Sequence, residues 1–164
     1  MGNAILYRMA SGIPGDISRQ SQATVEPGIF DAANAFASYG IPVKKVSGKI
    51  RPVASGDAAT VIIGLLVRPY PVTGGAGSDP LGTSTPPASG VGDVMRRGYM
   101  TVKCNAGSPA DGGVVYVRVG AAAAGKPIGG IEAAADSTNT VVMAGAVFKN
   151  AGDANGNVEI EYNI

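Results

Sequence analysis

Alternating apolar residues run through three segments of the chain, residues 97–104, 114–119 and 158–164. Successive side chains of a strand point to opposite faces, so this period of two predicts three half-buried strands of an antiparallel sheet. The apolar faces consist of Met100, Val102 and Cys104 in the first segment, Val115, Val117 and Val119 in the second, and Val158, Ile160, Tyr162 and Ile164 in the third.

Two longer apolar runs, residues 60–67 and 140–148, predict strands that are more completely buried. A strand covered on both faces needs no polar residues between its apolar ones. Each run contains one glycine, Gly64 or Gly145, which we expect to mark a bulge or a close approach of another part of the protein.

Turn-forming dipeptides predict two hairpins. Residues 41–46 and 49–53 are expected to pair because Ser47-Gly48 separates them. Asn155-Gly156 is the stronger signal, because a two-residue hairpin turn favours residues that accept a positive φ. We expect it to return the last strand against residues 140–148 or their extension.

Helix is scarce in this pattern. Only residues 31–38 favour two helical turns, with Asp31 as the N-cap. About seven or eight short strands separated by turns predict an all-β fold, either a single antiparallel β-sandwich or a jelly-roll-like barrel. The length of 164 residues is that of one domain, so residues 1–164 are expected to form a single β-rich domain.

Two segments lack the pattern of a compact core. Residues 1–38 are expected to be an irregular N-terminal extension, and residues 73–94 a long loop rich in Gly, Pro and Ser. Loops of that length are uncommon and usually either bind a partner or are disordered. Two interpretations therefore stay open for residues 8–30 and 73–94: plain surface segments, or arms that order against another protein.

The composition supports a turn-rich β protein with an aliphatic core. There are 25 glycines and 11 prolines, and aromatic residues make up only 5% of the chain, with no tryptophan. The formal net charge is +1. A nearly neutral chain exerts little long-range attraction on nucleic acids or anionic membranes, so we expect neither as a partner.

Two short motifs resemble ligand-binding loops, and each has a simpler interpretation. Residues 120–127 resemble a phosphate-binding loop, but Pro127 stands where a Ser or Thr would hold magnesium, so we expect an ordinary glycine-flanked loop. Asp153, Asn155 and Asn157 alternate like calcium ligands, but Val158 stands where the loop requires glycine. A hairpin turn explains these residues better.

The remaining side chains offer little chemistry. The chain has no histidine, and Cys104, its single cysteine, lies on an apolar strand face where a thiol is usually inert. We therefore expect no catalytic, cofactor-binding or metal-binding residues, no cofactor and no enzymatic activity. The basic residues are interpreted as a solvated strand edge, or as a contact for acidic patches on a protein partner. They are Lys44, Lys45, Lys49 and Arg51, with Arg96 and Arg97 further along the chain.

Three stretches resemble the structural cement, or head decoration, proteins of tailed bacteriophages. They are residues 11–30 (SGIPGDISRQSQATVEPGIF), 39–57 (YGIPVKKVSGKIRPVASGD) and 62–73 (IIGLLVRPYPVT). The features they share with that family are a Pro-Gly-Asp element, a Gly-Ile-Pro-Val strand start and an apolar strand that ends in Arg-Pro-Tyr-Pro. The resemblance covers roughly the first 73 residues.

This resemblance implies a protein of the virion, made in the host cytoplasm and bound to the outer surface of the capsid. Its implied partner is the major capsid protein, whose subunits it would bridge to stabilise the shell, and it would act as a homo-oligomer, a dimer or a trimer. The alternative is a β-sandwich ligand- or carbohydrate-binding module of a virion fibre or surface protein. The lack of tryptophan disfavours that alternative, because carbohydrate sites usually present aromatic platforms.

Overall fold

The computed structural model describes residues 12–69 and 85–164, and within them nearly all regular structure is β-strand. The predicted all-β class is confirmed. The strands are β1 (Thr24–Phe30), β2 (Pro42–Val46), β3 (Lys49–Pro52), β4 (Gly64–Leu66), β5 (Val91–Ala106), β6 (Val114–Arg118), β7 (Ile131–Glu132), β8 (Thr140–Phe148) and β9 (Asn157–Tyr162). Three single-turn 3-10 helices accompany them, η1 (Gln20–Gln22), η2 (Ala59–Val61) and η3 (Ser137–Asn139).

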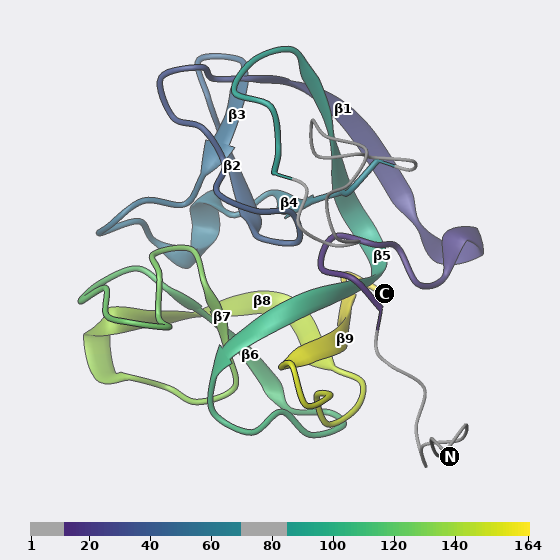
Figure 1. Cartoon of the computed structure of the whole chain (residues 1–164), viewed down its shortest axis with the longest axis vertical. Coiled ribbons are helices and arrows are strands. Elements are labelled where there is room, and N and C mark those ends of the chain that lie inside the picture. The colour runs from purple at the N-terminus through teal and green to yellow at the C-terminus, as the bar shows by residue number, and fades with distance from the viewer. Residues whose placement is uncertain (1–11, 70–84) are drawn as a thin grey trace, which may run out of the picture.

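The strands close into two rings that share β5 (Figure 1). In the first ring the order is β1-β3-β2-β4-β5, and the first half of β5 pairs back with β1. In the second ring the order is β5-β7-β6-β8-β9, and β9 pairs back with the second half of β5. Two rings joined in this way do not confirm the finer prediction of a sandwich or a jelly-roll-like barrel.

Gly98 lies where β5 passes from one ring to the other. The pairing with β1 extends to Arg97, and the pairing with β9 begins at Gly98. The φ of Gly98 is +137°, and a Cβ atom there would lie 3.0 Å from the Cα of Ala23. Only glycine fits this conformation easily, so it allows one strand of 16 residues to serve both rings.

Each ring encloses apolar side chains. In the first ring the buried cluster is Phe30, Phe36, Tyr39, Val43, Ile50, Leu66 and Val94. The second cluster fills the other ring and extends to the joint, where Leu65 and Met95 from the first ring take part. The predicted apolar faces of β5, β6 and β9 all point into the second cluster, except that Ile164 is 47% exposed.

Three of the sequence predictions are wrong. The extension predicted over residues 1–38 contains β1, which pairs with β5 over six residue pairs. Residues 91–94, predicted as the end of a long loop, form the beginning of β5, because they pair with β1. Residues 31–38 form turns and bends, not a helix, because Phe36 is drawn into the core. Asp31 does accept the backbone N–H of Ala33, as a capping residue would.

The two long apolar runs behave differently. In residues 60–67 only β4 is a strand, and it is preceded by η2. A Cβ atom at Gly64 would lie 2.4 Å from the carbonyl oxygen of Met95, so the glycine permits close contact with β5, as expected. Residues 140–148 do form β8, but the strand is half-buried, with Val142 48% exposed, because only one of its faces meets the core.

Both predicted hairpins are confirmed. Ser47 and Gly48 have φ values of 51° and 81° and join β2 to β3. β9 returns against β8 as expected, but the turn spans residues 153–156, where Gly156 donates its N–H to the carbonyl oxygen of Asp153 at 3.0 Å, so its central residues are Ala154 and Asn155. Its geometry is held by Asp153, whose Oδ1 accepts the backbone N–H groups of Asn155 and Asn157, both at 2.8 Å.

A buried ion pair lies in the second ring. Arg118 and Glu132 are each 1% exposed, and the guanidinium donates to both carboxylate oxygens of Glu132. It also donates to Asp136 at 2.7 Å and to the carbonyl oxygens of Gly120 and Ala121. The hydrogen bonds to Glu132 and then to Asp136 raise the pKa of Arg118, so the guanidinium stays charged.

Candidate protein-binding surface

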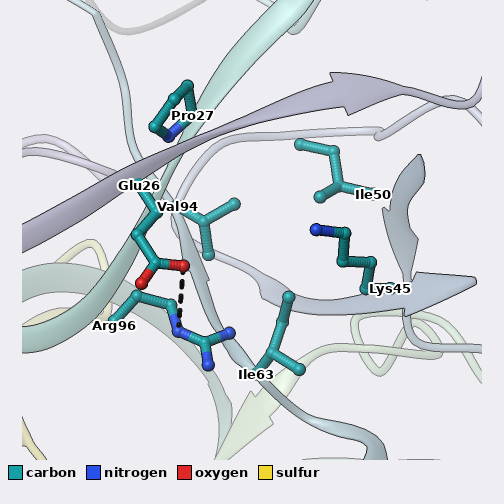
Figure 2. A pocket seen from close by; sticks show the side chains of 7 residues that line it. All are labelled: Glu26, Pro27, Lys45, Ile50, Ile63, Val94 and Arg96. Carbon is teal, nitrogen blue, oxygen red and sulfur yellow. Dashed lines mark ion pairs between the residues drawn. The ribbon is translucent and has the colours of Figure 1, made fainter. Parts of the chain in front are cut away.

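The first ring is open along part of β1. Its pairing with β3 consists of two residue pairs, Ile29 with Lys49 and Phe30 with Ile50, so residues 24–28 have no partner on that side. A cavity of about 210 Å³ occupies the opening (Figure 2). The residues that line it come from β1, β2, β3, β5 and the segment before β4, and they are Glu26, Pro27, Lys45, Ile50, Ile63, Val94 and Arg96.

The cavity combines an apolar floor with a charged rim. Ile50 and Val94 are each 2% exposed and form the floor with Ile63. In Figure 2, Glu26 and Arg96 lie on one side of the cavity. Lys45 lies on the opposite side, with its ammonium group directed into the cavity. The rim therefore carries two positive charges and one negative charge.

The ion pair on this rim is weak. Nε of Arg96 lies 3.6 Å from Oε2 of Glu26, and the two side chains are 36% and 61% exposed. Exposed pairs of this kind contribute about 0–1 kcal/mol, because water screens the charges. Arg96 is therefore able to exchange Glu26 for another carboxylate at little cost.

An exposed row of side chains crosses the first ring near its other end. The strand register places Val91, Ile29, Lys49 and Val46 side by side on β5, β1, β3 and β2. Val91 is 67% exposed, Ile29 58% and Val46 37%. We call Val91, Ile29 and Val46 the apolar row; Lys49 lies between Ile29 and Val46. The second ring exposes Val114 (45%) and Val142 (48%) on β6 and β8, two strands that pair with each other.

Residues 12–19 do not extend away from the body but lie along β5, and we call them the N-terminal strap. Gly15 donates its N–H to the carbonyl oxygen of Thr101 at 2.8 Å, and Thr101 donates back to Asp16 at 2.9 Å. Gly15 also accepts the N–H of Arg68 at 2.9 Å. The strap thus connects the first ring with the second.

Arg19 fixes the end of the strap. It donates to both carboxylate oxygens of Glu159, at 2.8 and 3.2 Å, and its guanidinium carbon lies 4.0 Å from the centre of the Tyr99 ring. Ser18 donates to the same carboxylate at 2.6 Å. Burial acts to raise the pKa of Glu159, but the hydrogen bonds from Arg19 and Ser18 outweigh it and lower the pKa.

These contacts change the prediction for the two arms. The part of residues 8–30 that the structure describes is the strap, η1 and β1, all of which lie against the protein's own body. Of residues 73–94, those up to 84 lie outside the described residues, and residues 91–94 belong to β5.

The basic residues separate into two groups. Lys44 pairs with Asp57 at 2.5 Å, and Arg51 pairs with Asp31 at 2.7 Å. These two are internal ion pairs. Lys45 and Arg96 instead meet at the cavity, although they are 51 positions apart in the sequence. The sequence marked both as basic, but nothing in its pattern indicated that they lie together or that Glu26 and Ile63 complete the site.

The two ligand-like motifs serve the fold. Residues 120–127 form a turn closed by backbone hydrogen bonds between Ala123 and Lys126, with Gly125 at a φ of +76°. The carboxylate of Asp153 accepts hydrogen bonds from the backbone N–H groups of Asn155 and Asn157, which confirms the hairpin interpretation. Cys104 is partly buried, and burial raises the pKa of its thiol, which keeps it protonated.

Over residues 12–69 and 85–164, no three His, Cys, Asp or Glu side chains gather in a way that could hold a metal ion. The same part of the chain has no helix with the length and apolar character needed to cross a membrane.

Comparisons with known proteins identify the family. A family model described as "XM1 gp53 minor capsid protein" matches residues 2–162. A chain in the solved structure "The capsid of Myoviridae Phage XM1" superimposes with a TM-score of 0.70 and 21% sequence identity, covering 99% of this chain and 97% of that one. Comparison with curated proteins gave no match. This protein therefore belongs to the XM1 gp53 minor capsid protein family, and the predicted kinship with phage capsid-associated proteins is confirmed.

Proposed function

We propose that this protein is a capsid decoration, or structural cement, protein that binds the outer surface of a phage head and bridges neighbouring major capsid protein subunits. The observation that carries the proposal is the family match over residues 2–162, which makes the chain a capsid-associated structural protein of the virion. Decoration and bridging go further and are argued from the two-ring body.

The two rings support bridging because each offers its own contact surface. The apolar row lies on the first ring, and Val114 and Val142 lie on the second. When one ring is bound, contact by the other becomes effectively intramolecular, so two modest interfaces give a large combined affinity. The shared strand β5 and the strap support treating both rings as one domain that holds the two surfaces at a fixed separation.

Self-association is also part of the proposal. Exposed aliphatic side chains such as Ile29 and Val91 would suit contacts between copies of this chain as well as contacts with the shell. Sedimentation equilibrium of the purified protein would distinguish a monomer from the dimer or trimer that we propose.

The aromatic residues do not favour the alternative of a carbohydrate-binding module. Within the described residues, only Tyr116 is more than slightly exposed, and the other aromatic side chains are buried. These are Phe30, Phe36, Tyr39, Tyr99, Phe148 and Tyr162. A sugar-binding face would need such rings on the surface.

The test is binding of the purified chain to expanded phage heads that lack it. We expect saturable co-sedimentation and a higher temperature of head disruption once the sites are filled. Immunolabelling of intact heads would show whether the bound chain lies outside. The proposal fails if intact heads do not bind the protein, or if binding leaves their thermal stability unchanged.

A further inference from the structure

We propose that the cavity of the first ring docks an acidic segment of a neighbouring capsid protein. In this arrangement an aliphatic side chain of the segment enters the cavity, and an adjacent carboxylate pairs with Lys45 and Arg96. The inference rests on the proposed function, since it assigns a partner to one surface of the decoration protein.

The size of the cavity suits one side chain. Sites for small molecules and cofactors usually enclose about 300–1,000 Å³. The cavity here measures about 210 Å³ and is only partly enclosed by Ile50, Ile63 and Val94. An aliphatic side chain would cover this apolar floor without leaving polar groups unpaired.

The net positive charge on the rim of the cavity favours binding of an acidic segment. Lys45 makes no ion pair with any residue in the described part of the chain, whereas Lys44 beside it is held by Asp57. Among the described residues, the guanidinium of Arg96 forms an ion pair only with Glu26, and that contact is long. A carboxylate placed between Lys45 and Arg96 would balance the excess positive charge of the rim.

The backbone beside the cavity disfavours an added strand. Pro27 lies in the part of β1 that has no partner on the β3 side, and it has no N–H to donate, which interrupts any ladder of hydrogen bonds along that edge. Binding through inserted side chains is therefore favoured over binding through strand addition.

A zero-length carbodiimide cross-link on decorated heads tests the contact directly, because the reagent joins an amine to a carboxylate that touches it. We expect mass spectrometry to find Lys45 joined to an Asp or Glu of another capsid protein. A link from Lys45 to Glu26, a link to a second copy of this chain, or an unmodified Lys45 would overturn the inference.

Two charge variants provide the second arm of the test. Lys45→Glu is expected to lower affinity for heads about tenfold, whereas Glu26→Gln, which removes the competing carboxylate, is expected to raise it about threefold. Arg97→Glu is the matched control, because Arg97 is the exposed neighbour of Arg96 on β5 and does not line the cavity. Its affinity should stay within about twofold of the wild type.

The outcomes separate the two proposals. If the wild type binds heads but Lys45→Glu and Glu26→Gln bind equally well, the cavity is not the contact and the decoration role stands. If the wild type does not bind, the decoration role fails and the cavity inference fails with it. Because Glu26→Gln predicts a gain in affinity, misfolding cannot produce the expected result.

Discussion

At the scale of single residues, the buried Arg118 shows what a charge needs in order to stay inside a protein. Its guanidinium is surrounded by acceptors, namely the carboxylates of Glu132 and Asp136 and the backbone oxygens of Gly120 and Ala121. Each donor group that burial removes from water thereby regains a partner. The pair holds β6 against β7, which is only two residues long.

Removal of one partner should therefore be costly. Arg118→Met leaves the carboxylate of Glu132 buried without a cation, and we expect a loss of about 3–5 kcal/mol in the free energy of unfolding, measured by chemical denaturation. The double variant with Glu132→Leu should recover much of this loss, because an apolar pair leaves no buried charge. Equal losses in the single and double variants would contradict this account.

Acidic pH should weaken the fold through its carboxylates. Burial acts to raise the pKa of Asp153, but hydrogen bonds from the backbone N–H groups of Asn157 and Asn155 and the side chain of Asn157 outweigh it and lower the pKa. A group with a lowered pKa in the folded state contributes stability above its unfolded pKa, and the contribution is lost as pH falls through the folded value.

We therefore expect the free energy of unfolding to be constant near neutral pH and to fall below about pH 4. Asp57 and Glu159 act in the same direction, since their pKa values are also lowered. Asp153→Asn should be less stable than the wild type at neutral pH and should show a shallower decline in acid. A variant with the wild-type slope would show that Asp153 does not take part.

At the scale of elements, the bend of β5 at Gly98 decides whether both rings can form. Gly98→Ala would place a side chain at a φ of +137° and 3.0 Å from the Cα of Ala23. We expect a loss of more than about 1 kcal/mol in the free energy of unfolding. Gly56→Ala is the control, because its φ of +80° is also positive but nothing lies within 4 Å of the new Cβ. A smaller loss for Gly98→Ala than for this control would contradict the role of the bend.

Strands whose pattern is local could be predicted from the sequence. The period of two in β5, β6 and β9, the turn at Ser47-Gly48 and the hairpin formed near Asn155-Gly156 follow from neighbouring residues alone. β1 was missed because Pro27-Gly28 interrupts its pattern, and the strand is stabilised by pairing with a segment more than 60 positions away. The alternation leaves Arg118 on the face opposite Val117 and Val119, but the side chain is buried because Glu132, 14 positions further on, lies beside it.

The cavity was beyond sequence reasoning for the same physical reason. Its seven residues are spread over positions 26 to 96. They meet only because strand pairing brings β1, β2, β3 and β5 together in the first ring. The incomplete pairing of β1 with β3, which creates the opening, depends on the register of two strands and on no single residue type.

At the scale of the whole molecule, the two rings predict two separable contributions to head binding. Ile29→Ser with Val91→Ser on the first ring, and Val142→Ser on the second, should each lower affinity for heads by about tenfold. Because these side chains are already exposed, the thermal unfolding temperature should change little. The exposed Ala37→Ser is the control and should bind like the wild type.

This loss should depend little on salt, because it arises from apolar contacts. A variant of one ring that abolishes binding completely, with no residual affinity from the other ring, would contradict the bridging arrangement.

The sharing of β5 has a mechanical consequence. If the two rings bind different shell proteins, as proposed, tension between those proteins passes from one ring to the other along the continuous polypeptide of β5. The two rings cannot come apart at the junction by sliding, because the polypeptide of β5 is continuous through it. Under the proposed bridging, a strained shell is therefore expected to break a contact with the shell or the strand pairing inside one ring, while the two rings stay joined through β5.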